Sequence, residues 1–200
     1  MEFSEVVRRR RMVRDYDPDR PVPEAVVERL LDNALRAPSA GFTQGWAFLV
    51  LDAAADRELF WTATGPDGPA TSRWLAGMRR APLIVVPLAN ESAYLDRYAE
   101  PDKGWTDRDP ARWPVPYWQI DTGFAALLML LTVVDEGLGA CFFGIPPDRT
   151  ARFREAFGVP EAYDPIGAIT IGYRAADRRS PSLRRGRRTV DQVVHRGRWG

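Results

Sequence analysis

Cysteine and histidine are almost absent from this chain of 200 residues, which has one of each, Cys141 and His195. A single cysteine excludes an internal disulfide framework and a cysteine-rich zinc site. With one histidine, a metal centre would need carboxylates almost alone, so we predict that the protein holds no metal. Lysine is nearly absent as well: Lys103 is the only one, and all other permanently charged basic side chains are arginines.

Long hydrophobic runs are also lacking. No segment has the roughly 20 uninterrupted apolar residues of a membrane span, and the start of the chain is rich in arginine, unlike a signal peptide. The apolar share of 45% is ordinary for a globular core, and 200 residues suit one domain better than two small ones. We therefore predict a single cytoplasmic domain over residues 1–200 with no membrane partner.

Arginines gather in two clusters, residues 8–14 and 178–188, although the net charge is only +1. The planar guanidinium can donate two parallel hydrogen bonds to a phosphate, so each cluster could bind one. For the first cluster, a solvated basic helix end is an equally good interpretation. The second cluster alone would suggest contact with nucleic acid, but the nearly neutral chain has no interleaved stacking motif, so we predict no nucleic-acid partner.

Hydrophobic periodicity predicts a chain in which helices alternate with short strands. The strands are continuous apolar runs, typical of the interior of a sheet. One helix is so apolar that it must be buried, either in the domain centre or in a subunit interface. This alternation predicts an α+β fold. The expected helices are 23–35, 118–136 and 146–158, with one or two more in 53–80 around a break at 65–69, and the expected strands are 46–51, 82–88, 139–145 and 165–173.

Residues 89–116 show no clear periodicity and combine several prolines with aromatic side chains, among them Trp105 and Trp113. A segment of this length without regular structure is more often functional than filler, so we predict an active-site loop. Core packing around the two tryptophans is the alternative, but the density of prolines favours a surface cover for a planar ligand.

Several motifs resemble the flavin-dependent nitroreductase family. The segment RRMVRDY, residues 10–16, is similar to the family's RRSVRxF, and APSAGFTQGW, residues 37–46, is similar to APSAGNxQPW, which leads into a strand. The similarity continues through GLGACFFGIP and GAITIGY to the closing RRGRRTVDQVVHRGRW. It covers nearly the whole chain in the right order, whereas neither GxGxxG nor a P-loop motif is present.

The resemblance implies an α/β/α sandwich with a central mixed, mainly antiparallel sheet, in an intertwined homodimer that binds FMN between its subunits. Helix 118–136 would form much of the interface, and residues 178–200 would form a C-terminal arm. The implied activity is ping-pong reduction of a nitroaromatic, a quinone or a similar electron-poor acceptor by NADPH or NADH. The flavin would carry the hydride, so no catalytic side chain is needed.

The same resemblance assigns roles to individual residues. Arg10 with Arg185 and Arg187 would bind the FMN phosphate, Arg188 taking part if the register slips by one. Arg14 would lie near the pyrimidine edge, where a cation favours the anionic reduced flavin, and the main-chain N–H of Gly144 would face flavin N5. The implied cofactor-binding set is Arg10, Arg11, Met12, Arg14, Pro38, Ser39, Ala40, Gln44, Phe142, Phe143, Gly144, Arg185, Arg187 and Arg188, and the implied substrate pocket is Phe42, Trp105 and Trp113.

Three positions depart from the family pattern: Met12 replaces serine, Phe42 replaces asparagine, and Gly45 replaces proline. One or two polar flavin contacts are then missing or come from the main chain, and Phe42 makes its side of the pocket more apolar. Relatives that fragment flavin or remove halogen are alternatives, as is a non-catalytic protein that binds flavin or deazaflavin. We predict that Cys141 is a buried structural thiol and that His195 is a packing or surface residue.

Overall fold

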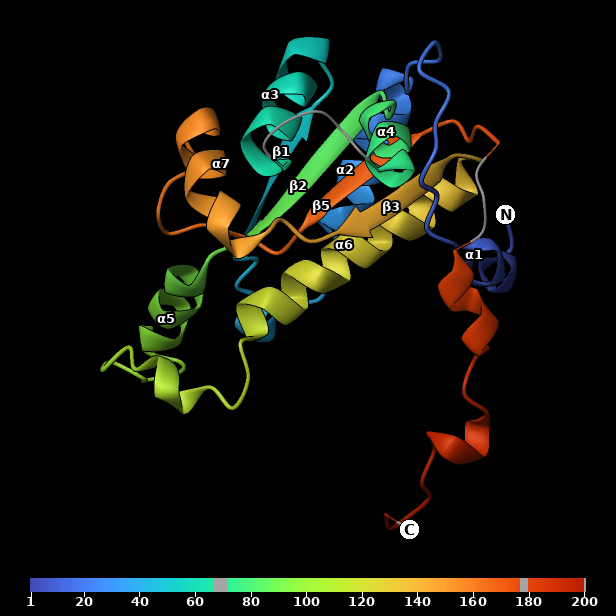
Figure 1. The fold of residues 1–200 in the computed structure, drawn as a ribbon. Helices are drawn as coiled ribbons and strands as arrows, with labels where there is room; N and C mark the ends of the chain where they lie inside the picture. Colours follow the sequence, from blue (N-terminus) through green and yellow to red (C-terminus); the bar gives the residue numbers. More distant parts are fainter. Residues whose placement is uncertain (67–71, 177–179, 200) are drawn as a thin grey trace.

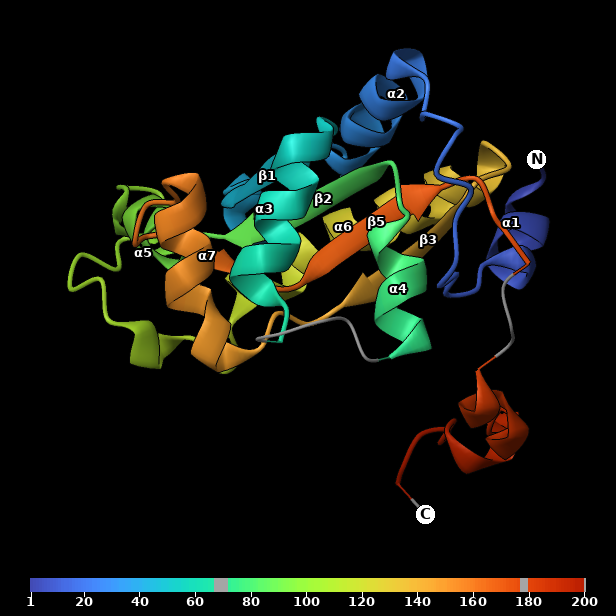
Figure 2. The same cartoon turned by 45° about the horizontal axis from the view of Figure 1, so that its top comes forward.

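The computed structural model describes residues 1–66, 72–176 and 180–199. A twisted sheet lies between two helical layers (Figures 1 and 2). Its strands follow the order β1-β2-β5-β3, the short β4 pairs with β2, and every ladder between these strands is antiparallel. The strands are β1 (Trp46–Leu51), β2 (Leu83–Ala89), β3 (Gly139–Phe143), β4 (Asp164–Pro165) and β5 (Ala168–Gly172).

Two cores flank the sheet because successive side chains of a strand point to opposite faces. Leu83 and Val85 of β2 pack with one pair of helices, whereas Ile84 and Val86 pack with the layer on the other face. These strands are buried on both sides, which explains their continuous apolar runs and confirms the predicted α/β/α arrangement. The first face is covered by α2 (Glu24–Ala34) and α6 (Tyr117–Asp135), and the second by α3 (Ala54–Thr64), α4 (Arg73–Arg79) and α7 (Thr150–Phe157).

The predicted bounds of the strands and helices differ from the observed bounds by a few residues. Strand 46–51 is β1 without a shift, but β3 and β5 are shorter than the predicted strands 139–145 and 165–173. Residues 164–165 instead pair with β2 as β4. The predicted helix 146–158 begins as the single 3₁₀ turn η3 (Pro147–Arg149), and its α-helical part is α7. Within the predicted break at 65–69, residues 67–69 lie outside the described residues.

The prediction that 89–116 has no regular structure is wrong for its first part. Helix α5 (Glu91–Ala99) begins there, because the side chain of Asn90 accepts a hydrogen bond from the N–H of Ala93 and caps it. A 3₁₀ turn, η2 (Pro110–Arg112), follows. The aromatic side chains pack on one another. The centroid of the Trp113 ring lies 4.4 Å from that of Tyr98 and 5.5 Å from that of Trp105, and only 9% of Trp113 is exposed.

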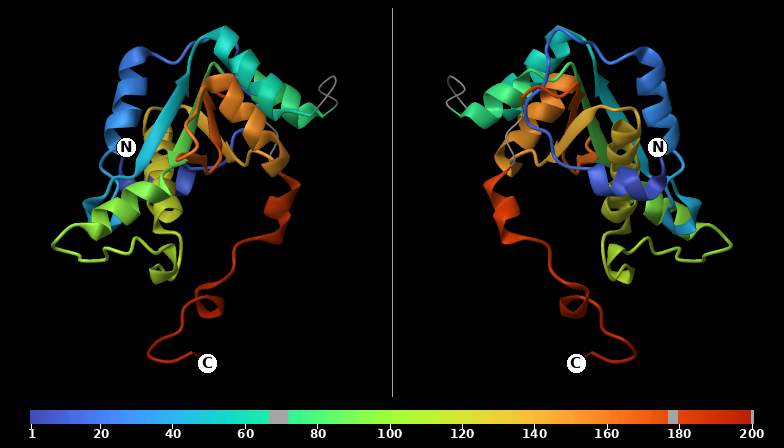
Figure 3. Two further views of the ribbon diagram at one scale, coloured as in Figure 1. Left: turned by 90° about the vertical axis from the view of Figure 1, so that its left-hand side faces the viewer. Right: turned by 90° about the vertical axis from the view of Figure 1, so that its right-hand side faces the viewer.

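The C-terminal arm, described over residues 180–199, extends away from the body (Figures 1 and 3). Its described residues contain only the 3₁₀ turns η4 (Pro181–Arg185) and η5 (Val190–Gln192). Several apolar side chains of the arm are left exposed. They are Leu183, Val190, Val193, Val194 and Trp199. Residues 178–179 and 200 of the predicted arm lie outside the described residues.

Helix α6 has the length and hydropathy of a membrane-crossing helix, a test that the core helix of a soluble protein also passes. Half of it is buried against the sheet and α2, so the single chain accounts for only part of the predicted burial. Its outer face carries exposed apolar residues at helical spacing, Ile120, Phe124 and Leu127. We call these three residues the α6 stripe.

Candidate functional site

The first arginine cluster continues the sheet beyond its outer strand. The N–H of Val13 donates to the carbonyl of Ala140 at 2.8 Å, and Met12 forms a parallel bridge with the same residue. The N–H of Phe142 approaches Met12 Sδ at 3.4 Å. The hydroxyl of buried Tyr16 donates to the Val13 carbonyl at 2.7 Å and fixes the end of the segment. The structure thus places residues 10–14, which follow helix α1 (Phe3–Arg9), beside β3.

Arg10 and Arg14 keep their charge available to a ligand. Both side chains are half-buried, and in the described ranges no carboxylate forms an ion pair with either of them. The guanidinium of Arg14 donates to the Met12 carbonyl at 3.3 Å, which directs it along the segment. By contrast, the neighbouring Arg9 is paired with Glu5 at 3.1 Å. Arg10 and Arg14 therefore supply cationic charge that no carboxylate of residues 1–66, 72–176 and 180–199 neutralises.

Helix α4 rests directly on this segment through Gly77. A Cβ at this position would lie 2.2 Å from the carbonyl oxygen of Arg14, closer than real Cβ contacts. The next turn of the helix adds an ion pair between Arg80 and Asp15 at 3.1 Å. Glycine is required here because two backbones touch.

We expect Gly77→Ala to lower the free energy of unfolding by about 1–3 kcal/mol, the usual cost of overpacking a tight contact. The added methyl must push Arg14 or α4 away, so the loss should appear as a lower urea midpoint. Ala76→Ser is the matched control, because it adds one atom to the exposed side of the same helix. Equal midpoints for the two variants would contradict the contact between α4 and the arginine segment.

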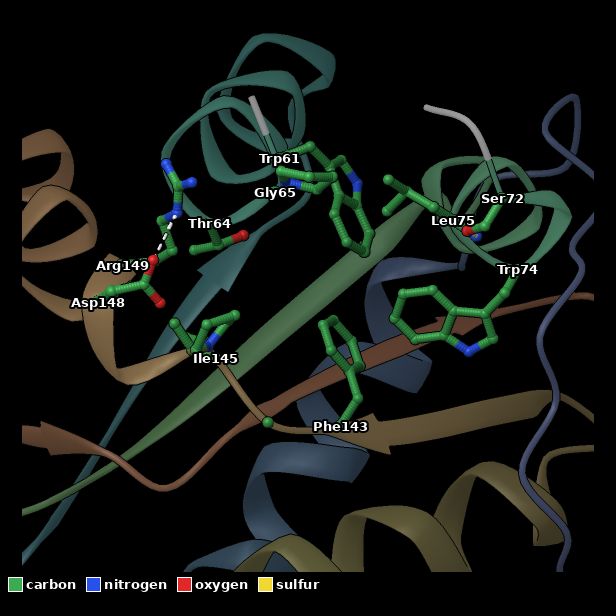
Figure 4. A pocket seen from close by; sticks show the side chains of 13 residues that line it. Trp61, Thr64, Gly65, Ser72, Trp74, Leu75, Phe143, Ile145, Asp148 and Arg149 are labelled. Carbon is green, nitrogen blue, oxygen red and sulfur yellow. Dashed lines mark hydrogen bonds and ion pairs between the residues drawn. The ribbon is translucent and has the colours of Figure 1, made fainter. Parts of the chain in front are cut away.

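A pocket of about 360 Å³ opens where β3 ends (Figure 4). Its walls are aromatic: Trp61 stacks on Phe143 with ring centroids 5.6 Å apart, and Trp74 meets Phe143 edge-on at 5.9 Å. No atom of the described residues lies within 4 Å of the point where a Cβ of Gly144 would stand, so these residues leave the main chain there open to a planar ligand. The pocket is lined by Trp61, Thr64, Gly65, Pro66, Ser72, Trp74, Leu75, Phe143, Gly144, Ile145, Pro146, Asp148 and Arg149.

Phe142 and Phe143, both predicted to pack by the flavin, lie on opposite faces of the sheet. Phe143 lines the pocket, whereas Phe142 packs with the core under α2 and α6. The Phe142 ring lies so close to Gly167 that a Cβ there would be 2.7 Å from it. Cys141 is buried, as predicted, on the α3 side of β3.

The turn over residues 38–44 lies away from the arginines, at the other end of α6. The N–H of Ala40 donates to Asp121 near the start of α6, whereas Val6 of α1 shares a cavity with Leu131 and Thr132 near its end. Figures 1 and 2 show α1 at one end of α6 and α5 near the other. With a rise of 1.5 Å per residue, residues 121 and 135 are separated by about 20 Å along the helix axis. One chain does not bring the two segments together.

The turn presents its side chains outward from a constrained backbone. Gly41, Phe42 and Gln44 all have positive φ, of 63°, 54° and 53°, in a segment that includes the 3₁₀ turn η1 (Ala40–Phe42). Phe42 is 77% exposed, and Gln44 is also exposed. The Ser39 hydroxyl accepts a hydrogen bond from the N–H of Gln44 at 3.0 Å.

The other predicted site residues lie elsewhere. Arg185, Arg187 and Arg188 are exposed on the arm, and Trp105 and Trp113 belong to the aromatic cluster beside α5. His195 stacks on Trp199 at 4.0 Å, within the arm. A role for Phe42, Trp105 and Trp113 in a substrate pocket stays a prediction.

Sequence reasoning missed Trp61, Trp74 and Arg149, which line the pocket. The two tryptophans stand on either side of the predicted break at 65–69, one on α3 and one on α4. Large aromatic residues flanking a Gly/Pro break are the signal that could have indicated them.

Comparison with known proteins gives consistent results. The model of the Nitroreductase family matches residues 7–173. A protein of Methanothermobacter thermautotrophicus, named as a candidate NADH dehydrogenase/NAD(P)H nitroreductase, is 28% identical over 177 residues, which are 88% of this chain and 78% of the relative. The structure of a nitroreductase family protein from Clostridium difficile superposes with a TM-score of 0.73 at 22% identity, covering all of both chains. A candidate nitroreductase from Exiguobacterium sibiricum, solved in complex with FMN, has a TM-score of 0.72 at 22% identity, covering 98% of this chain and 97% of the other.

Proposed function

Because the chain belongs to the nitroreductase family, we propose that it binds FMN and uses NADH or NADPH to reduce nitroaromatics, quinones or similar electron-poor acceptors. Two observations carry the proposal: Arg10 and Arg14, which form no ion pair within the described ranges, belong to a segment that pairs with β3, and an aromatic pocket lies at Gly144, directly after the same strand. A phosphate ester attached to a planar ring system matches both parts.

The residues fit FMN by their chemistry. Arg10, with Arg185 and Arg187 of the arm, would hold the phosphate through charge-assisted hydrogen bonds. The main-chain N–H of Gly144 would donate to flavin N5, since Gly144 has no side chain of its own and the described residues leave the space at its Cβ position open. When bound, FMN supplies two-electron hydride chemistry, which explains why the pocket needs no histidine or thiol.

The chain's own contribution is binding, electrostatics and exclusion of water. Arg14 places a positive charge where reduction adds negative charge, so it favours the reduced state of the site by direct attraction. Phe143, Trp61 and Trp74 line the pocket with apolar surface suited to a planar ligand. Protons for the acceptor come from water at the open side.

We infer a soluble, cytoplasmic homodimer in which each site uses residues of both chains. The arginines and the turn lie at opposite ends of α6, so a second copy placed antiparallel could bring Ser39 and Gln44 of one chain to Arg10 of the other. The α6 stripe and the apolar residues of the arm are the surfaces that such a copy would cover.

The test is the visible spectrum of the purified protein before and after anaerobic addition of NADH or NADPH. We expect flavin bands that bleach with at least one of the two donors. A protein that stays colourless after incubation with FMN would overturn the cofactor assignment. Bound flavin that neither donor bleaches would point to the non-catalytic binding protein or to another electron donor. Destruction of the flavin after reduction by NADH or NADPH, with oxygen as the only acceptor, would identify a flavin-fragmenting enzyme.

A further inference from the structure

The turn over residues 38–44 is held by a buried carboxylate that the proposed chemistry does not use. Asp121 is 2% exposed and lies near the start of α6. Its Oδ2 accepts two hydrogen bonds of 2.8 Å, from the N–H of Ala40 and from the hydroxyl of Tyr94. In the part of the chain that the structure describes, no arginine or lysine forms an ion pair with Asp121. A buried carboxylate without a cation is costly, so its partners must hold it in place.

Helix α5 and its N-cap residue Asn90 hold the same turn at two further points, both after Ala40. The N–H of Asn90 donates to the Gly45 carbonyl at 2.9 Å, and Arg97 Nε donates to the Gly41 carbonyl at 3.0 Å. A Cβ at Gly45 would lie 2.5 Å from the Tyr94 ring, so that ring and the turn are in direct contact. Asp121, Tyr94 and the turn thus form one packed unit joining α5 to α6.

The backbone of the turn needs this support. Phe42 and Gln44 both adopt the left-handed region, which residues with a Cβ occupy only when their surroundings impose it. Released from Asp121, the turn could return to commoner conformations, and the outward directions of these two side chains would change. Backbone strain of this kind gathers at ligand sites, where it fixes side chains in advance.

We propose that Asp121 and Tyr94 are positioning residues for the cofactor: the buried carboxylate fixes Ala40 and thereby presents Ser39 and Gln44 to FMN. The inference rests on the proposed function, in which this turn contacts the flavin. Burial and the adjacent Asp121 carboxylate raise the pKa of the Tyr94 hydroxyl well above its usual range, so the hydroxyl remains a donor at neutral pH.

The experiment uses the full-length protein with FMN and compares three variants. Asp121→Ala removes the acceptor, Asp121→Asn keeps one acceptor oxygen, and Tyr94→Phe removes only the hydroxyl. We expect the FMN dissociation constant to rise about tenfold in Asp121→Ala, which corresponds to one hydrogen-bond-sized loss, and less in the two conservative variants. The visible circular dichroism of the bound flavin, which reports its asymmetric surroundings, should change in the same order.

Thr132→Val is the matched control, because it removes a buried hydrogen bond between α6 and Asn33 at the opposite end of the same helix. It should lower the melting temperature but leave FMN affinity and the flavin dichroism unchanged. If Asp121→Ala does not fold, Tyr94→Phe carries the test. FMN binding and dichroism equal to wild type in the folded variants would overturn the positioning role alone, whereas a wild-type protein that binds no FMN would overturn the proposed function together with it.

Discussion

Replacing Arg10 by alanine is expected to weaken FMN binding by about 10- to 100-fold. A hydrogen bond to a charged group contributes about 1.5–3 kcal/mol, and every 1.4 kcal/mol is a factor of ten in affinity. The full amount is expected here because Arg10 is half-buried at the end of α1 and, among the residues that the structure describes, has no carboxylate partner whose release would offset the loss. Titrating the apoprotein into FMN and following quenching of flavin fluorescence, at one fixed ionic strength, measures the effect.

Arg9→Ala is the control for this prediction. It removes the same side chain one position earlier, but Arg9 is engaged with Glu5 on the surface of α1, so its loss should change affinity less than twofold. Similar losses in both variants would mean that general positive charge, and not a phosphate contact at Arg10, supports binding. Comparing Arg187→Ala with Arg188→Ala in the same assay decides which arginine of the arm takes part.

The fold was predictable where burial on both faces leaves a clear pattern. The bounds of strand β1 and of the long helix α6 match their apolar runs closely, since a polar residue would interrupt the run of buried side chains in either element. Helix α5 was missed because it is short and surrounded by prolines and because Tyr94 is its only buried residue. In the arm, residues 189–195 form only the turn η5, since a short helix needs tertiary packing to be stable and the side chains here are mostly exposed.

The candidate site was likewise predictable only in part. Residues 10–14 form one bridge to β3, between Met12 and Ala140, and residues 143–144 lie at the end of the same strand. The family resemblance indicated both segments. Trp61 and Trp74 come from different helices and meet Phe143 only after the sheet and its covering layer have formed. The opposite directions of Phe142 and Phe143 follow from strand alternation and could have been predicted.

Placing a charge in the α6 stripe is expected to have the largest effect of all. Leu127→Asp should convert a dimer into a monomer, because an unpaired carboxylate in an apolar interface costs several kcal/mol on each side of a two-fold axis. Sedimentation or light scattering at micromolar concentration measures the change. Leu59→Asp is the control: Leu59 on α3 is 40% exposed, close to the 46% of Leu127, but it lies on the opposite helical layer and should leave the mass unchanged.

The same variant tests whether the site is shared between chains. If the turn of one subunit and the arginines of the other contact the same FMN, the Leu127→Asp monomer should lose the cofactor although neither segment has been altered. A monomer that binds FMN as tightly as wild type would mean that one chain completes the site, in spite of the distance along α6 between Asp121 and the end that packs on α1. A variant that stays dimeric would place the interface elsewhere, and the exposed apolar residues of the arm would then be the surface to alter next.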